Sequence, residues 1–124
     1  MRGVLATAGM TAVLSSGVGC QNQSSVRALN GSREVLSLRL VSGPRDNGTD
    51  PIAGAVMGPM GRFIYEGPVP ANAELRIRRW ADGQEIGEVL TIDVPRRAEV
   101  QTTIDVSDGR LLLRDTSTRE LRSW

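Results

Sequence analysis

Residues able to carry out acid–base or nucleophilic chemistry are few in this chain of 124 residues. It contains no histidine and no lysine, its fifteen basic residues are all arginine, and its single cysteine is Cys20. A nucleophilic serine, threonine or cysteine normally needs a base beside it, and imidazole and thiolate are the usual ligands of structural zinc. The composition therefore predicts neither a nucleophile–base pair nor a zinc site. We expect a protein that is not an enzyme and that uses no cofactor.

Carboxylates are the remaining candidates for chemistry. Asp46, Asn47 and Asp50 could offer oxygen ligands to Ca²⁺, but the segment lacks the alternating ligands and the terminal glutamate of a dedicated calcium loop. Asp93 and Asp105 could lie side by side on neighbouring strands as a pair of acids, although like charges in that position destabilise a sheet. We therefore expect solvated strand faces without a metal, and a carboxylate-based glycan hydrolase is the least favoured function.

Two features are typical of contact surfaces. Met57 and Met60 flank a Gly-Pro pair, and soft methionine side chains suit adaptable interfaces; the alternative is a methionine packed beneath its own turn. Trp80 follows two arginines in the outward phase of a predicted strand, where it could stack on guanidinium groups or on a sugar ring. A bulge at Arg79 would instead turn Trp80 into the core, and the sequence leaves both alternatives open.

The N-terminal residues have the three-part layout of a secretory signal, with Arg2, an apolar run over residues 3–14 and small residues before Cys20. The apolar run is shorter than the roughly 20 residues of a membrane-spanning helix. Residues 17–20, Gly-Val-Gly-Cys, resemble the cleavage box of bacterial lipoprotein signals, in which a lipidated cysteine follows small residues. The resemblance implies cleavage between Gly19 and Cys20 and a diacylglycerol on the Cys20 sulfur, which would anchor the protein to a membrane.

These features divide the chain into three parts. We expect a lipoprotein signal peptide, of helical conformation, over residues 1–19, the lipidated Cys20 with a polar linker over residues 20–33, and a single domain over residues 34–124. The expected location is the cell envelope. Gln21 directly follows the cysteine, and a residue of this kind at that position resembles lipoproteins that are sorted to the outer membrane, or its periplasmic side, in bacteria that have two membranes.

The charge pattern argues against nucleic acid as a partner. The formal net charge is +1, and arginines are interspersed with acidic residues along the chain. Binding to phosphates requires an excess of cationic side chains that displace counterions. The membrane, reached through the lipid anchor, and an envelope protein or a glycan are the partners that remain.

From residue 34 onward, apolar residues recur at every second position, as half-buried strands require. The Asp-Gly pairs at 82–83 and 108–109 separate such runs and favour tight hairpin turns. About seven short strands predict an all-β fold, a small antiparallel β-sandwich of immunoglobulin or transthyretin type. The clearest alternating sets are Leu36, Leu38 and Leu40; Leu75 and Ile77; Leu90, Ile92 and Val94; Val100, Ile104 and Val106; and Leu111 and Leu113.

Three short segments are similar to carboxypeptidase regulatory-like domains. Residues 50–56, Asp-Pro-Ile-Ala-Gly-Ala-Val, match the opening of such domains, and residues 61–63, Gly-Arg-Phe, and 69–71, Val-Pro-Ala, fill later positions of the pattern. The resemblance implies a transthyretin-like sandwich with a binding or structural role.

Together these features predict a cell-envelope lipoprotein whose β-sandwich is a non-catalytic binding or structural module. The alternative is a pilotin-like accessory lipoprotein that helps to assemble an envelope complex. That alternative predicts a stable protein partner on the Met57–Met60 loop or on an open strand edge.

Overall fold

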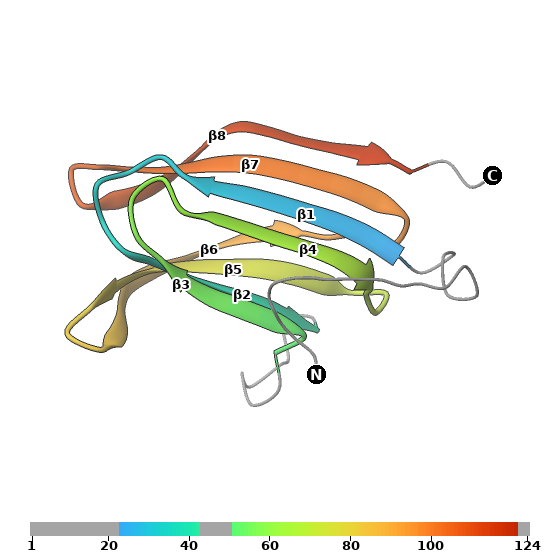
Figure 1. The fold of residues 1–124 in the computed structure, drawn as a ribbon, viewed down its shortest axis with the longest axis horizontal. Helices are drawn as coiled ribbons and strands as arrows, with labels where there is room; N and C mark the ends of the chain where they lie inside the picture. The colour runs from blue at the N-terminus through green and yellow to red at the C-terminus, as the bar shows by residue number, and fades with distance from the viewer. Residues whose placement is uncertain (1–22, 43–50, 122–124) are drawn as a thin grey trace.

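The structure is a computed structural model that describes residues 23–42 and 51–121. Eight strands form two layers that pack face to face (Figure 1). The described residues contain no helix, and hence none that could span a membrane. The strands are β1 (Gln23–Asn30), β2 (Leu36–Ser42), β3 (Ala53–Met57), β4 (Arg62–Pro68), β5 (Ala73–Ala81), β6 (Gln84–Asp93), β7 (Ala98–Ser107) and β8 (Arg110–Glu120).

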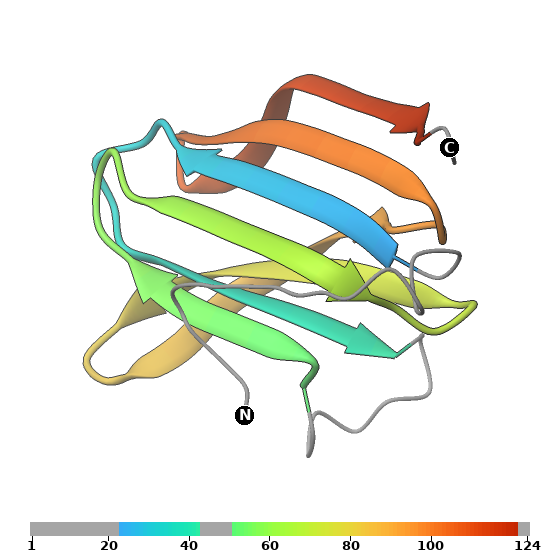
Figure 2. The ribbon, with the colours of Figure 1, turned by 45° about the vertical axis from the view of Figure 1, so that its right-hand side comes forward.

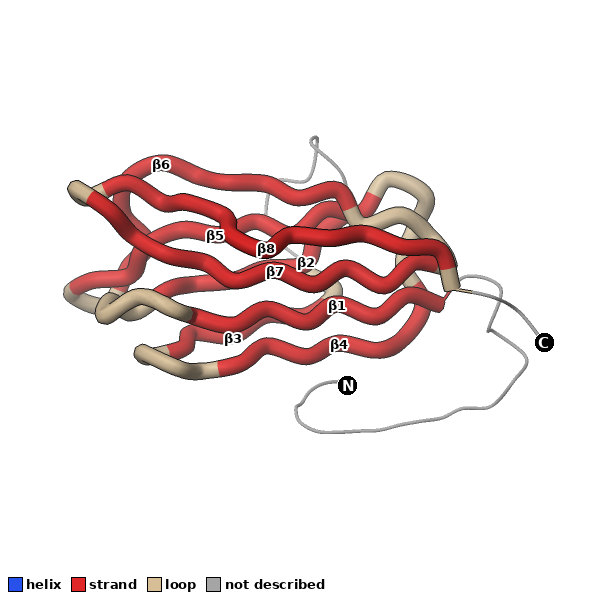
Figure 3. The backbone as a smooth tube through the Cα atoms, turned by 90° about the horizontal axis from the view of Figure 1, so that it is seen from above, coloured by secondary structure: helices blue, strands red, loops and turns tan. Residues whose placement is uncertain are grey.

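Each layer is a four-stranded sheet. The first sheet has the strand order β4-β1-β7-β8 and the second has the order β3-β2-β5-β6 (Figures 2 and 3). The chain crosses from one sheet to the other four times, between β1 and β2, β3 and β4, β4 and β5, and β6 and β7. The predicted all-β sandwich is therefore confirmed. One pairing departs from the antiparallel expectation, because β1 runs parallel to β7.

The polar linker predicted over residues 20–33 was wrong from residue 23 onward, where the chain forms β1. This strand lies between β4 and β7 in the middle of the first sheet, and it raises the number of strands to eight. Val26 is fully buried, and the hydroxyl of Ser24 donates to the carbonyl of Pro95 at 2.6 Å. Ser24 is thus compatible with a strand because its hydroxyl has a partner, whereas the buried hydroxyl of Ser25 bonds to no described residue. The predicted cleavage site at Gly19 and Cys20 lies outside the described residues.

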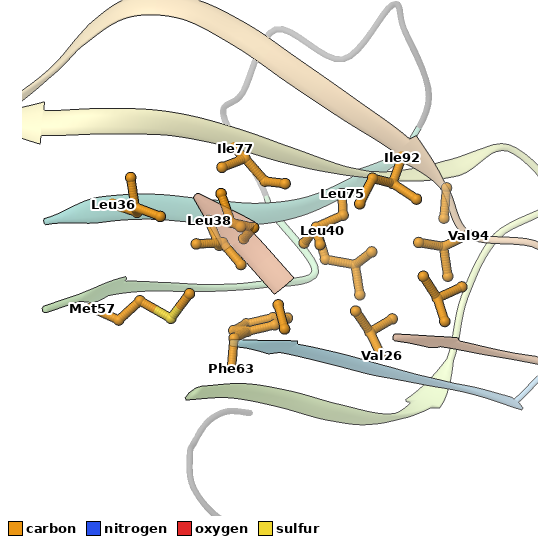
Figure 4. Packing of buried hydrophobic residues seen from close by; sticks show 14 of the residues in the cluster. Val26, Leu36, Leu38, Leu40, Met57, Phe63, Leu75, Ile77, Ile92 and Val94 are labelled. Carbon is orange, nitrogen blue, oxygen red and sulfur yellow. The ribbon is translucent and has the colours of Figure 1, made fainter. Parts of the chain in front are cut away.

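Aliphatic side chains from both sheets fill the space between the layers (Figure 4). Leu36, Leu38 and Leu40 alternate along β2 and are fully buried, as the period-two pattern predicts. Phe63 is the one phenylalanine of the chain and packs in the same cluster. Such a core gains its stability from many small apolar areas removed from water, at about 25 cal/mol per Å².

Two hairpin turns each join neighbouring strands, β5 to β6 in the second sheet and β7 to β8 in the first. Asp82 and Gly83 have φ angles of 54° and 78°, and Asp108 and Gly109 have φ angles of 54° and 75°. Positive φ at both central residues is the requirement of the type I′ turn, which matches the twist of a hairpin. Both predicted Asp-Gly turns are confirmed.

A buried amide ties the crossover from β1 to β2 to the connection between β3 and β4. Asn30 Nδ2 lies 2.8 Å from the carbonyl oxygen of Glu34 and 3.1 Å from those of Met57 and Gly58. Its Oδ1 accepts hydrogen bonds from the backbone N–H and the hydroxyl of Ser32, at 2.9 and 2.6 Å. Asn30 is fully buried, so every one of these bonds replaces water that the site excludes.

We predict that Asn30→Asp lowers the free energy of unfolding by about 3 kcal/mol, because a carboxylate would place an acceptor or a buried charge against three carbonyl oxygens. Chemical denaturation measured by circular dichroism gives the value. Asn72→Asp makes the same change at an exposed turn position and should stay within about 0.5 kcal/mol of wild type. Equal stability of the two variants would contradict the role given to Asn30.

Candidate functional site

A shallow groove crosses the outer face of the second sheet near the β5–β6 hairpin. Ser37, Arg39, Gly54, Arg78, Trp80 and Glu85 are among the residues that line it. We call this surface the Trp80 groove. The residues come from β2, β3, β5 and β6, so the groove depends on the pairing of all four strands of the sheet.

The direction of Trp80 is set by an irregularity in the pairing of β5 with β6. Ile77 pairs with Leu90, whereas Arg79 pairs with Ile86, so β6 contains two more residues than β5 in this interval. The extra residues lie in β6, where Gly87 has a φ of 77°, and β5 keeps its alternation. Trp80 therefore lies opposite Glu85 on the outer face and is half-buried. Of the two alternatives that the sequence leaves open, the structure has the outward one.

Backbone contacts hold Trp80 in place while its indole stays available. The N–H of Trp80 donates to the carbonyl of Val35 at 2.9 Å, which attaches the strand to the β1–β2 crossover. The indole N–H makes no hydrogen bond to any residue in the described ranges. The half-buried side chain of Trp80 thus lines the groove with an indole N–H that no described residue accepts.

Beside the indole, an ionic cluster is centred on Glu85. Its two carboxylate oxygens accept hydrogen bonds from Arg39 Nη2 and Nε at 2.6 and 2.9 Å, in a bidentate pair. The hydroxyl of Ser37 donates to the same carboxylate at 2.7 Å, and Arg78 Nη1 lies 3.6 Å from it. The bond from Arg39 lowers the pKa of the Glu85 carboxyl; burial opposes the shift, and Ser37 and Arg78 add to it. Glu85 is therefore a fixed anion rather than a proton donor at neutral pH.

The expected methionine surface is not assembled. Met57 is buried in the core cluster, with 6% of its surface exposed, because it lies opposite Leu36 on the inner face of β3. Met60 is 68% exposed and has a φ of 65°, an uncommon conformation for a residue other than glycine. The prediction of a surface formed by both residues is therefore wrong for Met57, and Met60 alone is available to a partner.

The structure does not bring Asp93 and Asp105 together, because they lie on β6 and β7 in different sheets. Asp93 instead lies opposite Glu74, whose carboxylate is bonded to Arg76 at 2.8 Å. This pair lies at the end of β5 remote from Trp80. Within residues 23–42 and 51–121 no three potential metal-ligating residues cluster, and the calcium candidate at residues 46–50 lies outside the described residues.

Sequence reasoning identified Trp80 but missed Ser37, Arg39 and Glu85. The first two share the outward phase of β2, so their common face was readable from the alternation. Glu85 could not be placed, because the register of β6 against β5 changes within the strand. Placing Glu85 would have required the position of this register shift between β5 and β6.

The lowered pKa of Glu85 predicts a pH-dependent contribution to stability. A carboxyl with a pKa below its unfolded value stabilises the fold above that value, and the contribution is lost as the pH falls through the folded pKa. Glu85→Gln should therefore cost about 1 kcal/mol at pH 7. The difference from wild type should shrink as the pH falls below the ordinary value of 4.5.

Denaturation of both proteins as a function of pH measures this difference directly. The pKa of Glu99 is also lowered, by Arg119, but this contribution cancels in the comparison. Glu66→Gln removes an exposed carboxylate that is 3.6 Å from Arg27 and should change stability by less than about 0.5 kcal/mol. A difference between wild type and Glu85→Gln that does not vary with pH would contradict the assignment.

Comparisons with known proteins found no relative of this chain. No family model, no curated protein and no solved structure matches the chain. The resemblances to lipoprotein signals and to carboxypeptidase regulatory-like domains accordingly stay predictions, and the Trp80 groove is interpreted from its own chemistry.

Proposed function

We propose that this chain is a lipid-anchored protein of the cell envelope whose sandwich is a non-catalytic binding module. The Trp80 groove is the proposed binding surface. The observation that carries the proposal is the outward indole of Trp80 beside the fixed Arg39–Glu85 pair. Concave surfaces that combine an apolar platform with a few oriented polar groups are the usual form of ligand sites.

The ionisation state of Glu85 favours binding over hydrolysis. Glycoside hydrolysis uses two carboxyl groups that flank the bond, one of them a proton donor with a raised pKa. The lining of the groove contains one carboxylate, Glu85, and its pKa is lowered. Such a group can accept hydrogen bonds from a ligand, but it is a poor general acid.

The lipid anchor would set the orientation of the sandwich. Three Cα–Cα steps separate Cys20 from Gln23, the first residue of β1, and they reach at most about 11 Å. An acylated Cys20 would therefore keep the start of β1 close to the membrane. The β5–β6 hairpin lies at the other end of the molecule (Figures 1 and 2), so the Trp80 groove would face away from the membrane.

A second candidate function is the pilotin-like assembly role. Met60 supports it, because an exposed apolar side chain at positive φ is a local cost that partner binding would offset. This function predicts a stoichiometric protein partner that co-purifies with wild type and is lost from Met60→Asp. Retention of that partner by Trp80→Ala would separate it from the groove.

The anchor is tested by intact mass and by fractionation of cells that express the full chain. We expect the protein in the membrane fraction to lack residues 1–19 and to carry acyl chains. Cys20→Ser should lose the acyl mass entirely and leave the membrane fraction, because no thiol remains for the thioether bond.

Gln21→Ser is the matched control, since it alters the neighbouring residue and keeps the cysteine. It should remain acylated. An unprocessed wild-type chain in the soluble fraction would overturn the proposed anchor.

A further inference from the structure

We propose that the Trp80 groove binds a neutral saccharide chain, whose sugar ring stacks on the indole and whose hydroxyl groups bond to the polar wall. This inference names the ligand class of the proposed binding module. The assignment of the ligand to the envelope rests on the proposed lipid anchor, whereas the binding chemistry rests on the groove alone.

The indole of Trp80 fits one side of a pyranose ring. A sugar ring has a face of C–H groups that is apolar and a rim of hydroxyls that is polar. A half-buried, outward tryptophan offers a rigid apolar platform of matching size, and its N–H needs an acceptor when a ligand covers it. A hydroxyl oxygen at the edge of the stacked ring supplies that acceptor.

The charged groups of the groove are paired with one another, so they meet a ligand mainly as oriented hydrogen-bonding groups. The Glu85 carboxylate holds Arg39 in a bidentate pair and lies 3.6 Å from Arg78. The bidentate pair of Arg39 and Glu85 is neutral as a unit. Arg78 is the remaining charge of the lining, and its Nη2 already donates to the carbonyl of Gly87 at 2.7 Å. Hydroxyl groups both donate and accept, so they can bond to either member of the pair. The exposed amide of Gln84 adds a neutral donor and acceptor to the same groove.

The shape of the groove favours a chain over a small molecule. Gly54 lies opposite Arg39 on β3 and contributes no side chain to the outer face, so the floor stays low between Val56 and the arginine. Enclosed pockets bury most of a small ligand, whereas this groove is shallow. A polymer can lie across it and continue beyond both ends.

The place of the groove in the fold favours an envelope glycan over a lipid head group. Trp80 is bonded to Val35, on the crossover that follows the last residue of β1. The eight residues of β1 span about 25 Å, which separates this end from the end that an acylated Cys20 would hold at the membrane. Saccharides within reach are therefore those of the space above the membrane surface.

The test is a titration of the full-length Cys20→Ser chain with chitotetraose and cellotetraose as neutral probes and an oligogalacturonate as the acidic one. Trp124→Phe in the same chain leaves Trp80 as the single tryptophan, so its fluorescence reports the groove directly. Calorimetry gives the dissociation constants. We expect at least one neutral probe to bind in the micromolar to millimolar range and to shift the emission of Trp80.

Trp80→Ala should weaken the binding of that probe by about tenfold or more with an unchanged far-ultraviolet circular dichroism spectrum. Glu85→Gln should weaken it less, because the amide keeps part of the hydrogen bonding. Trp124→Phe alone should leave the affinity unchanged.

Three results would overturn the inference: no binding of either neutral probe at millimolar concentration, equal affinity in Trp80→Ala, or preference for the acidic probe. Since Cys20→Ser carries no acyl chain, these results are independent of the anchor. Loss of acylation in the wild-type protein with intact saccharide binding would instead overturn the proposed anchor and leave the groove assignment standing.

Discussion

The buried amide of Asn30 is the constraint on which this sandwich depends at the end that carries the groove. Two of the four crossings between the sheets meet there, and carbonyl oxygens of both, those of Glu34, Met57 and Gly58, accept hydrogen bonds from its side chain. One side chain supplies donors to both connections, while its oxygen fixes the turn at Ser32. The crossover that it shapes then presents the carbonyl of Val35 to Trp80. Asn30 does not line the groove, but it therefore helps to set the groove's geometry.

Glycines contribute to the same junction through the space that they leave. A Cβ on Gly61 would lie 2.9 Å from the carbonyl oxygen of Gly58 and from the Cβ of Met57, and a Cβ on Gly31 would lie 3.0 Å from Thr103. The distances at Gly61 are shorter than real Cβ contacts, so the turn between β3 and β4 requires a bare position there, whereas a Cβ on Gly31 would require Thr103 to shift by a few tenths of an ångström. The Gly-rich segment 57–61 is thus a packing requirement of the junction. Its exposed methionine, Met60, follows from that geometry and is the residue to which the pilotin-like alternative assigns a partner contact.

The sequence predicts the parts of the fold that follow a regular period. Leu36, Leu38 and Leu40 are buried as their alternation requires, and both Asp-Gly turns have the expected positive φ angles. The start of β1 could not be predicted, because its polar residues have the composition of a tether and the carbonyl that Ser24 bonds to, that of Pro95, is 71 residues away. The outward indole was one of two open alternatives, since the register change lies in β6 rather than at Arg79. Glu85 was missed for the same reason, because long-range register has no local signature, whereas the shared face of Ser37 and Arg39 follows from the alternation of β2.

The parallel pairing of β1 with β7 has a consequence for the order in which the molecule can fold. Ser24 and Ala98 are joined by a hydrogen bond although they are 74 residues apart. During synthesis, β1 thus cannot complete its sheet until β7 and β8 have followed it. Folds dominated by such distant contacts form slowly, so the emerging chain stays extended for longer than a chain of local hairpins would. Completion of the first sheet is therefore tied to the late strands β7 and β8.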